Sequence, residues 1–166
     1  MIRAAILTIS DKGSRGERED KSGAAIRDAL RQIQAAVCDY KIVPDERPMI
    51  AAELRRMAKH ADVVLTTGGT GVGPRDVTPE ATRDVIEKEL PGFAEAMRME
   101  SYKVTPRAII SRALAGIHGK TLIVNLPGSP KAVAECLAVV LPAIPHTVEL
   151  IRGEVVECAR PTESNQ

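Results

Sequence analysis

The feature that most constrains this chain is a glycine-rich stretch near its middle. Residues 65–79 read LTTGGTGVGPRDVTP and join an apolar strand pattern to a new helix pattern. Gly68, Gly69, Gly71 and Gly73 allow a tight turn in which backbone N–H groups stay uncovered. Uncovered N–H groups at a turn from strand to helix can bind an anion such as phosphate. The stretch therefore predicts a strand-to-helix connection with a candidate phosphate cradle.

The residues that follow the glycines add charge and a helix start. Arg75 and Asp76 would place a cation and a carboxylate beside the cradle. Thr78 is suited to cap the next helix, and Pro79 to occupy its first position. A lone glycine cluster is more often a structural turn, and this one matches neither the P-loop nor the dinucleotide-binding motif. The adjacent charges and the capped helix favour phosphate binding.

Strand and helix patterns alternate along the chain. Nearly continuous apolar runs at residues 3–10, 62–67 and 121–126 are typical of buried strands, and residues 37–43 alternate like a strand near the sheet edge. Helices are predicted over residues 22–36, with Ser22 as N-cap, over residues 48–60 and 79–90, and, after an interruption at Pro91-Gly92, over residues 93–105. A last helical region is predicted over residues 130–152, broken near Pro142 and Pro145. This order predicts an α/β layered fold with a mostly parallel sheet.

One pair of strands is expected to run antiparallel. Only residues 118–120 separate a weaker strand pattern at residues 108–117 from the apolar run at residues 121–126. Parallel neighbours need a crossover of about a dozen or more residues. The sheet is therefore expected to be mixed.

Composition narrows the class of protein. The 166 residues fit one domain, expected over residues 1–153, with a polar tail at residues 154–166. A net charge of +1 and an aromatic content of 2% do not indicate a protein that binds nucleic acid. No uninterrupted apolar run reaches the roughly 18 residues of a membrane span, and the N-terminus enters a strand pattern directly. We therefore expect a cytoplasmic protein that binds neither nucleic acid nor membrane.

The cysteines predict neither a zinc site nor a nucleophile. Cys38, Cys136 and Cys158 are far apart and form no CxxC pair or zinc spacing with the histidines. Cys38 and Cys136 fall on apolar faces and are expected in the core.

Polar turns follow the predicted parallel strands. They are Ser10-Asp11, residues 44–46, the glycine stretch and residues 127–129. The carboxyl ends of parallel strands share one sheet edge, where ligands of α/β folds bind. We expect these turns to border one crevice, with Ser129 capping a helix whose first turn carries Lys131.

Asp45 and Asp76 are the candidates for a metal site in that crevice. As a pair they could hold Mg²⁺ against phosphate oxygens, since magnesium usually takes one or two carboxylates together with substrate phosphates. Taken singly, Asp45 is a common turn residue or helix cap, and Asp76 is typical of an Asx turn before Thr78. Both interpretations stay open on these residues alone.

Several motifs together resemble the molybdopterin-binding family. The main match is TTGGTGVGPRDVTPEAT at residues 66–82. TISD at residues 8–11, VPDE at 43–46, PGF at 91–93 and NLPGSP at 125–130 extend it, so the resemblance covers nearly the whole chain in order. It is nearest to the small single-domain adenylyltransferases of molybdenum cofactor biosynthesis and their near relatives.

The resemblance implies a three-layer α/β/α sandwich with one antiparallel strand, assembled as a homotrimer. It also implies Mg²⁺-dependent transfer of AMP from ATP to the terminal phosphate of molybdopterin, with release of pyrophosphate. The adenylylated product would then pass to a molybdate-inserting enzyme.

The resemblance also implies roles for residues at matching positions. Asp45 and Asp76 match catalytic, metal-binding aspartates. The nucleotide and phosphate loop would comprise Thr67, Gly68, Gly69, Thr70, Gly71 and Arg75. The remaining pocket walls would comprise Ser10, Asp11, Pro127, Gly128, Ser129 and Lys131.

Two other functions compete with this enzyme. A carrier or scaffold could bind molybdopterin in the same pocket and pass it on without chemistry. The intact carboxylates favour the enzyme, because a pure anion-binding protein gains nothing from two negative charges near phosphate. A flavodoxin-like FMN protein is disfavoured because few aromatic residues are present to stack on a flavin.

Overall fold

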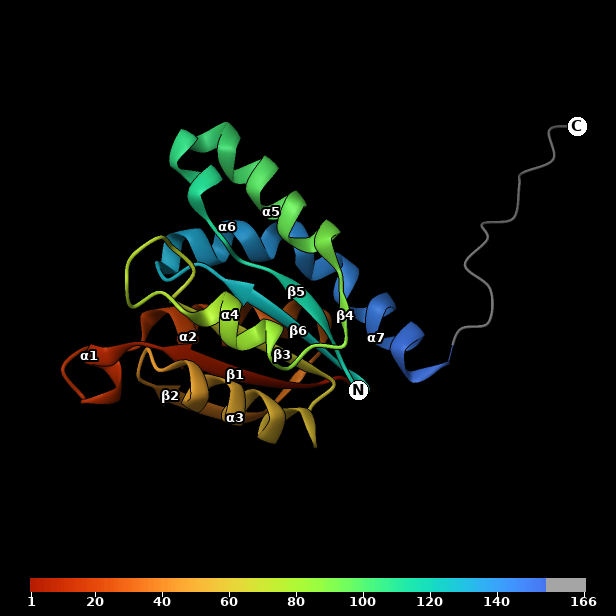
Figure 1. Cartoon of the computed structure of the whole chain (residues 1–166). Helices are drawn as coiled ribbons and strands as arrows, with labels where there is room; N and C mark the ends of the chain where they lie inside the picture. Colours follow the sequence, from red (N-terminus) through yellow and green to blue (C-terminus); the bar gives the residue numbers. More distant parts are fainter. Residues whose placement is uncertain (155–166) are drawn as a thin grey trace, which may run out of the picture.

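A six-stranded mixed sheet with the order β2-β1-β3-β6-β5-β4 lies between layers of helices in the computed structural model (Figure 1). The structure describes residues 1–154, so residues 155–166 of the predicted tail lie outside the described residues. The strands are β1 Arg3–Ile9, β2 Ala36–Val43, β3 Val63–Thr67, β4 Lys88–Glu89, β5 Ala115–His118 and β6 Thr121–Leu126. This architecture confirms the expected three-layer α/β/α sandwich.

Parallel pairing holds the centre of the sheet together. β2, β1, β3 and β6 run parallel, with Ala4 in register with Val63 and Val63 in register with Leu122. Every residue of β3 and β6 is buried, whereas β2 alternates between exposed and half-buried residues along most of its length. β5 runs antiparallel to both β6 and β4, which confirms the predicted mixed sheet.

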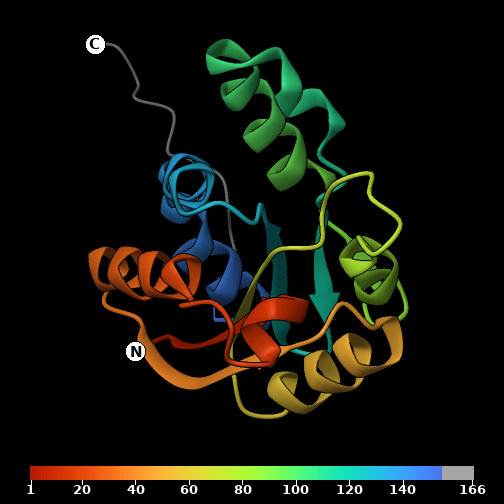
Figure 2. The ribbon, with the colours of Figure 1, turned by 90° about the vertical axis from the view of Figure 1, so that its left-hand side faces the viewer.

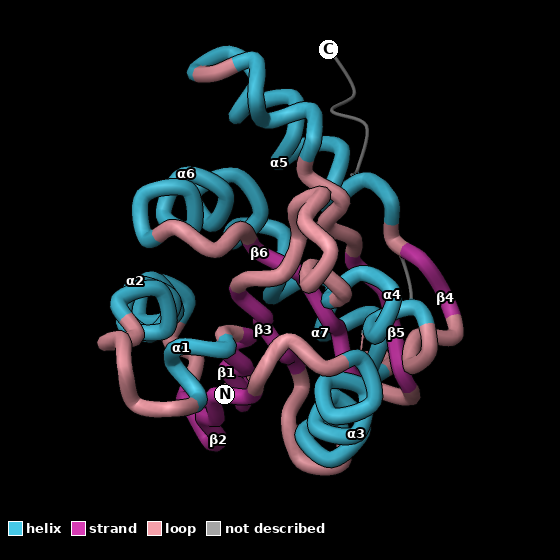
Figure 3. The backbone as a smooth tube through the Cα atoms, turned by 60° about the vertical axis from the view of Figure 1, so that its left-hand side comes forward, coloured by secondary structure: helices cyan, strands magenta, loops and turns pink. Residues whose placement is uncertain are grey.

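Helices cover both faces of this sheet. One face carries α2 Lys21–Leu30, α5 Pro91–Val104, α6 Pro130–Val140 and α7 Ile144–Arg152, and the other carries α3 Arg47–Ala58 and α4 Thr78–Arg83 (Figure 2). Figure 3 shows the strands between α2 and α6 on one side and α3 and α4 on the other. Successive residues of a strand point to opposite faces, so Leu65 joins one core cluster and Val64 the other.

The polar segment at residues 11–20 contains a short helix. α1, Asp11–Ser14, begins directly after β1. The Ser10 hydroxyl caps it by accepting a hydrogen bond from the Gly13 N–H at 3.0 Å. This side-chain bond stabilises a turn too short for helical periodicity to reveal.

The predicted cap of α2 is wrong. Asp20 is the N-cap, because its carboxylate accepts the Gly23 N–H at 2.8 Å. The Ser22 hydroxyl donates instead to the Gly128 carbonyl at 2.6 Å, which ties α2 to the turn after β6. α2 also ends earlier than predicted, at Leu30, and a 3₁₀ turn follows.

The helix predicted at residues 79–90 is shorter than expected. α4 ends at Arg83, and β4 follows because the backbone of residues 87–90 bonds to β5. Pairing with the sheet replaces the helical hydrogen bonds there. α5 then begins at Pro91, so the Pro91-Gly92 pair starts a helix rather than breaking one.

The strand predicted at residues 108–117 forms only at its end. A 3₁₀ helix, Pro106–Ile110, occupies the first part, and the Thr105 hydroxyl caps it. Proline fixes φ and offers no N–H to a sheet, which favours the turn. β5 begins only at Ala115.

The C-terminal helices are interrupted where the sequence predicts it, near Pro142 and Pro145. A 3₁₀ turn, Leu141–Ala143, separates α6 from α7, and Gly153 ends α7 with a φ of 79°. Together they span 23 residues, within which a window of 18 residues reaches a mean hydropathy of 1.5, and this matches a membrane-spanning helix by length and composition alone. Its buried residues, including Leu137 and Ile144, pack in the core against the sheet.

The two cysteines within residues 1–154 differ in their surroundings. Cys38 is exposed on the edge strand β2, so the prediction that it lies in the core is wrong. Its thiol donates to the Ala4 carbonyl at 3.4 Å. Cys136 is buried as predicted, and burial raises the pKa of its thiol. Cys158 lies outside the described residues.

A buried polar cluster joins α4 to the sheet. The Asn125 side-chain amide donates to the Thr66 hydroxyl at 3.1 Å and to the Thr82 hydroxyl at 2.9 Å, and its oxygen accepts the Leu114 N–H at 3.3 Å. Asn125, Thr66 and Thr82 are fully buried. The cluster fixes the helix that follows the glycine stretch against β3 and β6.

Replacing Asn125 with leucine tests this cluster. We expect Asn125→Leu to lower the free energy of unfolding by about 2–4 kcal/mol, because the buried Leu114 N–H and Thr66 hydroxyl lose their partner. Urea unfolding measures the loss. Thr147→Val is the control, since it removes one exposed hydroxyl bond to the Ala143 carbonyl and should cost about 0.5 kcal/mol or less. A loss no larger than that of the control would contradict the role of the cluster.

Candidate functional site

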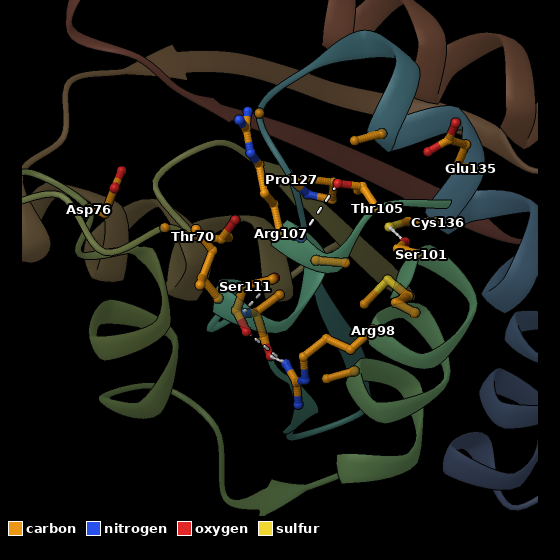
Figure 4. A pocket seen from close by; sticks show the side chains of 18 of the residues that line it. Thr70, Asp76, Arg98, Ser101, Thr105, Arg107, Ser111, Pro127, Glu135 and Cys136 are labelled. Carbon is orange, nitrogen blue, oxygen red and sulfur yellow. Dashed lines mark hydrogen bonds between the residues drawn. The ribbon is translucent and has the colours of Figure 1, made fainter. Parts of the chain in front are cut away.

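The turns after the parallel strands border two adjoining hollows at one edge of the sheet. The polar hollow, about 790 Å³, has Ser10, Asp20, Asp45, Thr67, Gly68 and Ser129 among its lining residues. The apolar hollow, about 400 Å³, has Thr70, Gly71, Asp76, Met97, Ser101 and Cys136 among its lining residues (Figure 4). Gly69 and Gly128 border both hollows, so the hollows meet at the glycine loop, residues 68–76.

The glycine loop requires glycine at its first positions. Gly68 and Gly69 have φ values of 95° and 66°, in the left-handed region that other residues rarely adopt. A Cβ atom at Gly68 would collide with the Ile9 carbonyl oxygen, and one at Gly69 with the Thr78 hydroxyl. Side chains are therefore excluded, and the backbone itself borders the hollows.

Thr78 holds the first carbonyl groups of the loop. Its hydroxyl donates to the Gly68 carbonyl at 2.8 Å, and its N–H donates to the Gly69 carbonyl at 3.1 Å. Thr78 is buried and is the first residue of α4, whereas Val77 occupies the N-cap position and makes no side-chain cap bond. The prediction that Thr78 caps this helix is therefore wrong, because its hydroxyl anchors the loop.

Arg112 holds the next carbonyl groups. Its N–H donates to the Thr70 carbonyl at 2.9 Å, its Nε to the Gly71 carbonyl at 2.6 Å and its Nη2 to the Asp76 carbonyl at 2.6 Å. Its Nη1 forms an ion pair with Glu80 of α4. Sequence reasoning missed this residue, although an arginine inside an apolar strand pattern is a signal that could have found it.

These contacts turn the N–H groups of the loop the other way. A trans peptide unit is planar, so a carbonyl that points at Thr78 or Arg112 directs the N–H of the same unit to the opposite side. Within residues 1–154, the N–H groups of residues 69–72 donate to no protein acceptor. Consecutive free N–H groups form an anion-binding concavity. The loop therefore has the geometry of a phosphate cradle.

Asp45 and Asp11 join the turns that follow β2 and β1. The Asp11 N–H donates to Asp45 Oδ2 at 2.9 Å, and the Asp45 N–H donates to Asp11 Oδ1 at 3.0 Å. Burial raises the pKa of the Asp45 carboxyl, and the charges of Asp11 and Asp76 raise it further. The hydrogen bond from the Asp11 N–H acts in the opposite direction but does not cancel this rise. A bound cation would stabilise the ionised form of Asp45.

Asp76 lies at the other end of the glycine loop. Its Oδ2 accepts the Gly73 N–H at 2.8 Å, three residues back along the chain. The Asx turn before Thr78 that the sequence allowed does not form, because the Thr78 N–H donates to the Gly69 carbonyl. Its Oδ1 has no hydrogen-bond partner in the described part of the chain. Asp76 borders the apolar hollow and Asp45 the polar one, so the two acids lie on either side of the shared Gly69.

The cations Arg75 and Lys131 do not line these hollows. The Arg75 guanidinium donates to both carboxylate oxygens of Asp11 at 2.9 Å and to Glu46 at 3.0 Å. This contact holds the pKa of Asp11 below its ordinary value. The Lys131 side chain is 82% exposed and lies 3.9 Å from a carboxylate oxygen of Glu135. Arg75 therefore ties the loop to neighbouring turns, and Lys131 faces solvent.

The turn after β6 forms the wall between the hollows. Pro127 borders the apolar hollow, Gly128 borders both, and Ser129 borders the polar one. The Thr67 hydroxyl donates to the Pro127 carbonyl at 2.7 Å, which fixes this wall to the end of β3. Ser129 caps α6 as predicted by accepting the Ala132 N–H at 3.2 Å.

Asp20 organises the far wall of the polar hollow. Its Oδ2 accepts hydrogen bonds from the Thr8 hydroxyl at 2.6 Å and from the Tyr40 hydroxyl at 2.7 Å. Burial raises the pKa of the Tyr40 hydroxyl to about 12, and the hydrogen bond to Asp20 is the second cause of this rise. In the sequence, Asp20 stands out only as one of several loop aspartates.

The metal ligands at this site are few. Within the described range no group of three or more His, Cys, Asp or Glu side chains could hold a metal ion. Mg²⁺ often takes one or two carboxylates and completes its coordination with water and substrate phosphates. Asp45 and Asp76 thus fit a magnesium ion that arrives with a phosphate ligand better than a resident metal.

Comparison with known proteins agrees with this geometry. A family model described as a probable molybdopterin binding domain matches residues 5–146. Molybdopterin adenylyltransferase of Helicobacter pylori strain J99 is 49% identical over 160 residues, which cover 94% of this chain and 91% of that protein.

Two solved structures share both sequence and fold with the chain. The molybdopterin biosynthesis enzyme MoaB from Thermus thermophilus has a TM-score of 0.87 at 52% identity, over 92% of this chain and 98% of that one. The tungsten cofactor synthesizing protein MoaB from Pyrococcus furiosus has a TM-score of 0.84 at 38% identity, over 92% of this chain and 98% of that one. Since the family model spans most of the chain and relatives match nearly end to end, the chain belongs to the molybdopterin-binding domain family.

Proposed function

We propose that this chain is a molybdopterin adenylyltransferase, which transfers AMP from ATP to the terminal phosphate of molybdopterin and releases pyrophosphate. The observation that carries the proposal is the row of N–H groups at residues 69–72, which have no acceptor within residues 1–154 and lie beside Asp45 and Asp76. The similarity to a Helicobacter pylori protein of that name, over most of both chains, supports the same activity.

The reaction brings two anionic groups together. A terminal phosphate oxygen of molybdopterin attacks the α-phosphorus of ATP, and the bond to the β-phosphate breaks so that pyrophosphate leaves with its electron pair. Catalysis then depends on neutralising charge and aligning the phosphates. The loop amides can donate to phosphate oxygens without rearrangement, because Thr78 and Arg112 already hold the carbonyls. Two hollows that meet at Gly69 give each substrate a place with its phosphate at the shared border.

Asp45 and Asp76 are the residues that would hold Mg²⁺. The ion supplies positive charge that neutralises the phosphates and polarises their oxygens. Asp76 offers its Oδ1, which has no partner in the described part of the chain, and Asp45 offers a half-buried carboxylate with a pKa raised by burial and by neighbouring acids. Both carboxylates are therefore suited to a cation that enters with the nucleotide.

A carrier that holds molybdopterin without chemistry is the second candidate. The row of loop N–H groups supports it, since these groups can bind a phosphate without any chemistry. The same loop amides would bind the pterin phosphate, with tight pterin binding and no pyrophosphate release. The enzyme is preferred because the carboxylates beside the loop would oppose phosphate binding unless a cation joined them.

The expected setting is the cytoplasm, where a homotrimer would pass the adenylylated pterin to a molybdate-inserting enzyme. Exposed apolar side chains on α5 and the following 3₁₀ helix support self-association: Met99, Tyr102, Val104 and Ile109. The C-terminal part of α5 and the 3₁₀ helix stand away from the sheet (Figure 2). Exposed apolar side chains gathered on neighbouring elements are typical of protein contacts.

Replacing Asp76 with asparagine tests the catalytic role of its carboxylate. The new amide oxygen can still accept the Gly73 N–H, so the turn is kept while the charge is lost. We expect pyrophosphate release from ATP, with molybdopterin and Mg²⁺ present, to fall at least about a hundredfold. Asp28→Asn removes an exposed acid paired with Arg31 and should keep the wild-type rate. An unchanged rate in Asp76→Asn would refute the role, and tight pterin binding without turnover in the wild type would favour the carrier.

Asp45→Asn is expected to raise stability while it lowers activity. Its folded-state pKa lies above the unfolded value, so the folded chain carries a penalty that grows as pH rises past the unfolded-state pKa and is complete above the folded-state pKa. The neutral amide removes that penalty and can still accept the Asp11 N–H. We expect a higher urea midpoint than wild type at pH 7, with the gain lost below a pH of about 3.9, and slower pyrophosphate release. An equal or lower midpoint at pH 7 would contradict this electrostatic account.

A further inference from the structure

Arg112 contacts both ends of the glycine loop without lining either hollow. We propose that Arg112 is a positioning residue for phosphate binding: its guanidinium fixes the carbonyl groups of the loop so that the N–H groups and the Asp76 carboxylate face the substrate. This inference rests on the proposed function of the loop as a phosphate cradle.

The guanidinium closes the loop like a clamp. Nε and Nη2 bind the carbonyls of Gly71 and Asp76, each at 2.6 Å, and within the intervening chain the Gly73 N–H donates to the Asp76 carboxylate. Hydrogen bonds from a charged donor are stronger than neutral ones. These bonds therefore fix the path of the chain between the two carbonyls and the position of Asp76.

Two N–H groups depend on this side chain in particular. The Gly71 carbonyl shares its peptide unit with the Val72 N–H, and the Asp76 carbonyl shares its unit with the Val77 N–H. Among the described residues neither N–H donates to a protein acceptor. Since both carbonyls point at the guanidinium, both N–H groups point away from it. Without the clamp these peptide units could rotate and present carbonyl oxygens, which repel phosphate.

The clamp is itself anchored in the core. Nη1 of Arg112 pairs with Glu80, which lies on α4. α4 is held to the sheet by the bond from the Asn125 amide to Thr82. The pairing with Glu80 also neutralises the guanidinium charge, so Arg112 acts through the loop and not as a cation offered to the substrate.

Lysine cannot replace arginine in this position. The guanidinium is a planar fork with several donors, whereas the lysine ammonium is a single point charge. Arg112→Lys therefore keeps the charge beside Glu80, but its three donors share one nitrogen and cannot reproduce the separate contacts of Nε and Nη2 with the Gly71 and Asp76 carbonyls. This separates the positioning role from simple charge balance.

The test compares Arg112→Lys and Arg112→Ala with Arg47→Lys. Arg47 forms an equivalent fork to Asp84, at 2.7 Å through both nitrogens, but touches neither the loop nor the hollows. Calorimetry measures the dissociation constants of ATP and of inorganic pyrophosphate with Mg²⁺, and urea unfolding measures stability. We expect Arg112→Lys to weaken pyrophosphate binding about ten- to a hundredfold with a near-wild-type urea midpoint, and Arg47→Lys to bind as the wild type does. Guanidinium ions at low concentration should partly restore binding to Arg112→Ala.

The outcomes separate this inference from the proposed function. If the wild type binds pyrophosphate and releases it from ATP, and Arg112→Lys does both equally well, the positioning role is refuted while the activity stands. If affinity falls only as far as the folded fraction falls, and guanidinium restores nothing, Arg112 is merely structural and the inference is again refuted. If the wild type neither binds nor releases pyrophosphate, the proposed function fails first.

Discussion

The site depends on the direction in which the peptide groups of one loop point. A backbone turn presents donors and acceptors in equal number, and only the donors attract phosphate. In this chain the buried Thr78 hydroxyl and the Arg112 guanidinium take up carbonyls of the glycine loop, and the N–H groups of residues 69–72 are left without partners among the described residues. Selective satisfaction of acceptors thus converts a neutral stretch of backbone into an anion-binding surface.

This arrangement is held in place from the core outward. Asn125, fully buried, fixes α4 through Thr82, and α4 carries Thr78 at its start and Glu80 beside Arg112. The loop therefore moves only if a buried polar cluster is broken, which is costly. Because the cradle is already ordered before the substrate binds, no binding free energy is lost in ordering it. This favours alignment of phosphates in a transfer reaction.

Unlike the contacts that hold the loop, the ionised Asp45 carboxylate beside the cradle opposes folding. Asp45 is half-buried near Asp11 and Asp76, and its pKa is raised by burial and by their charges. Such a group opposes folding when ionised and gains from a cation, as is common where activity takes precedence over stability. Arg75 offsets part of this repulsion although it lines neither hollow, because it lowers the pKa of Asp11 through their hydrogen bonds and opposes the rise in the pKa of Asp45 through its charge.

Local periodicity is enough to predict part of this structure. The apolar runs of β1, β3 and β6, the Ser129 cap and the antiparallel β5–β6 pair are all readable from the amino-acid order, because burial on both faces and short connections leave a local record. The early end of α4, the anchoring of the loop by Thr78 and its clamping by Arg112 leave no such record. These features depend on which distant groups meet after folding. A hydroxyl or guanidinium binds whichever partner packing brings near, and no short-range pattern encodes that choice.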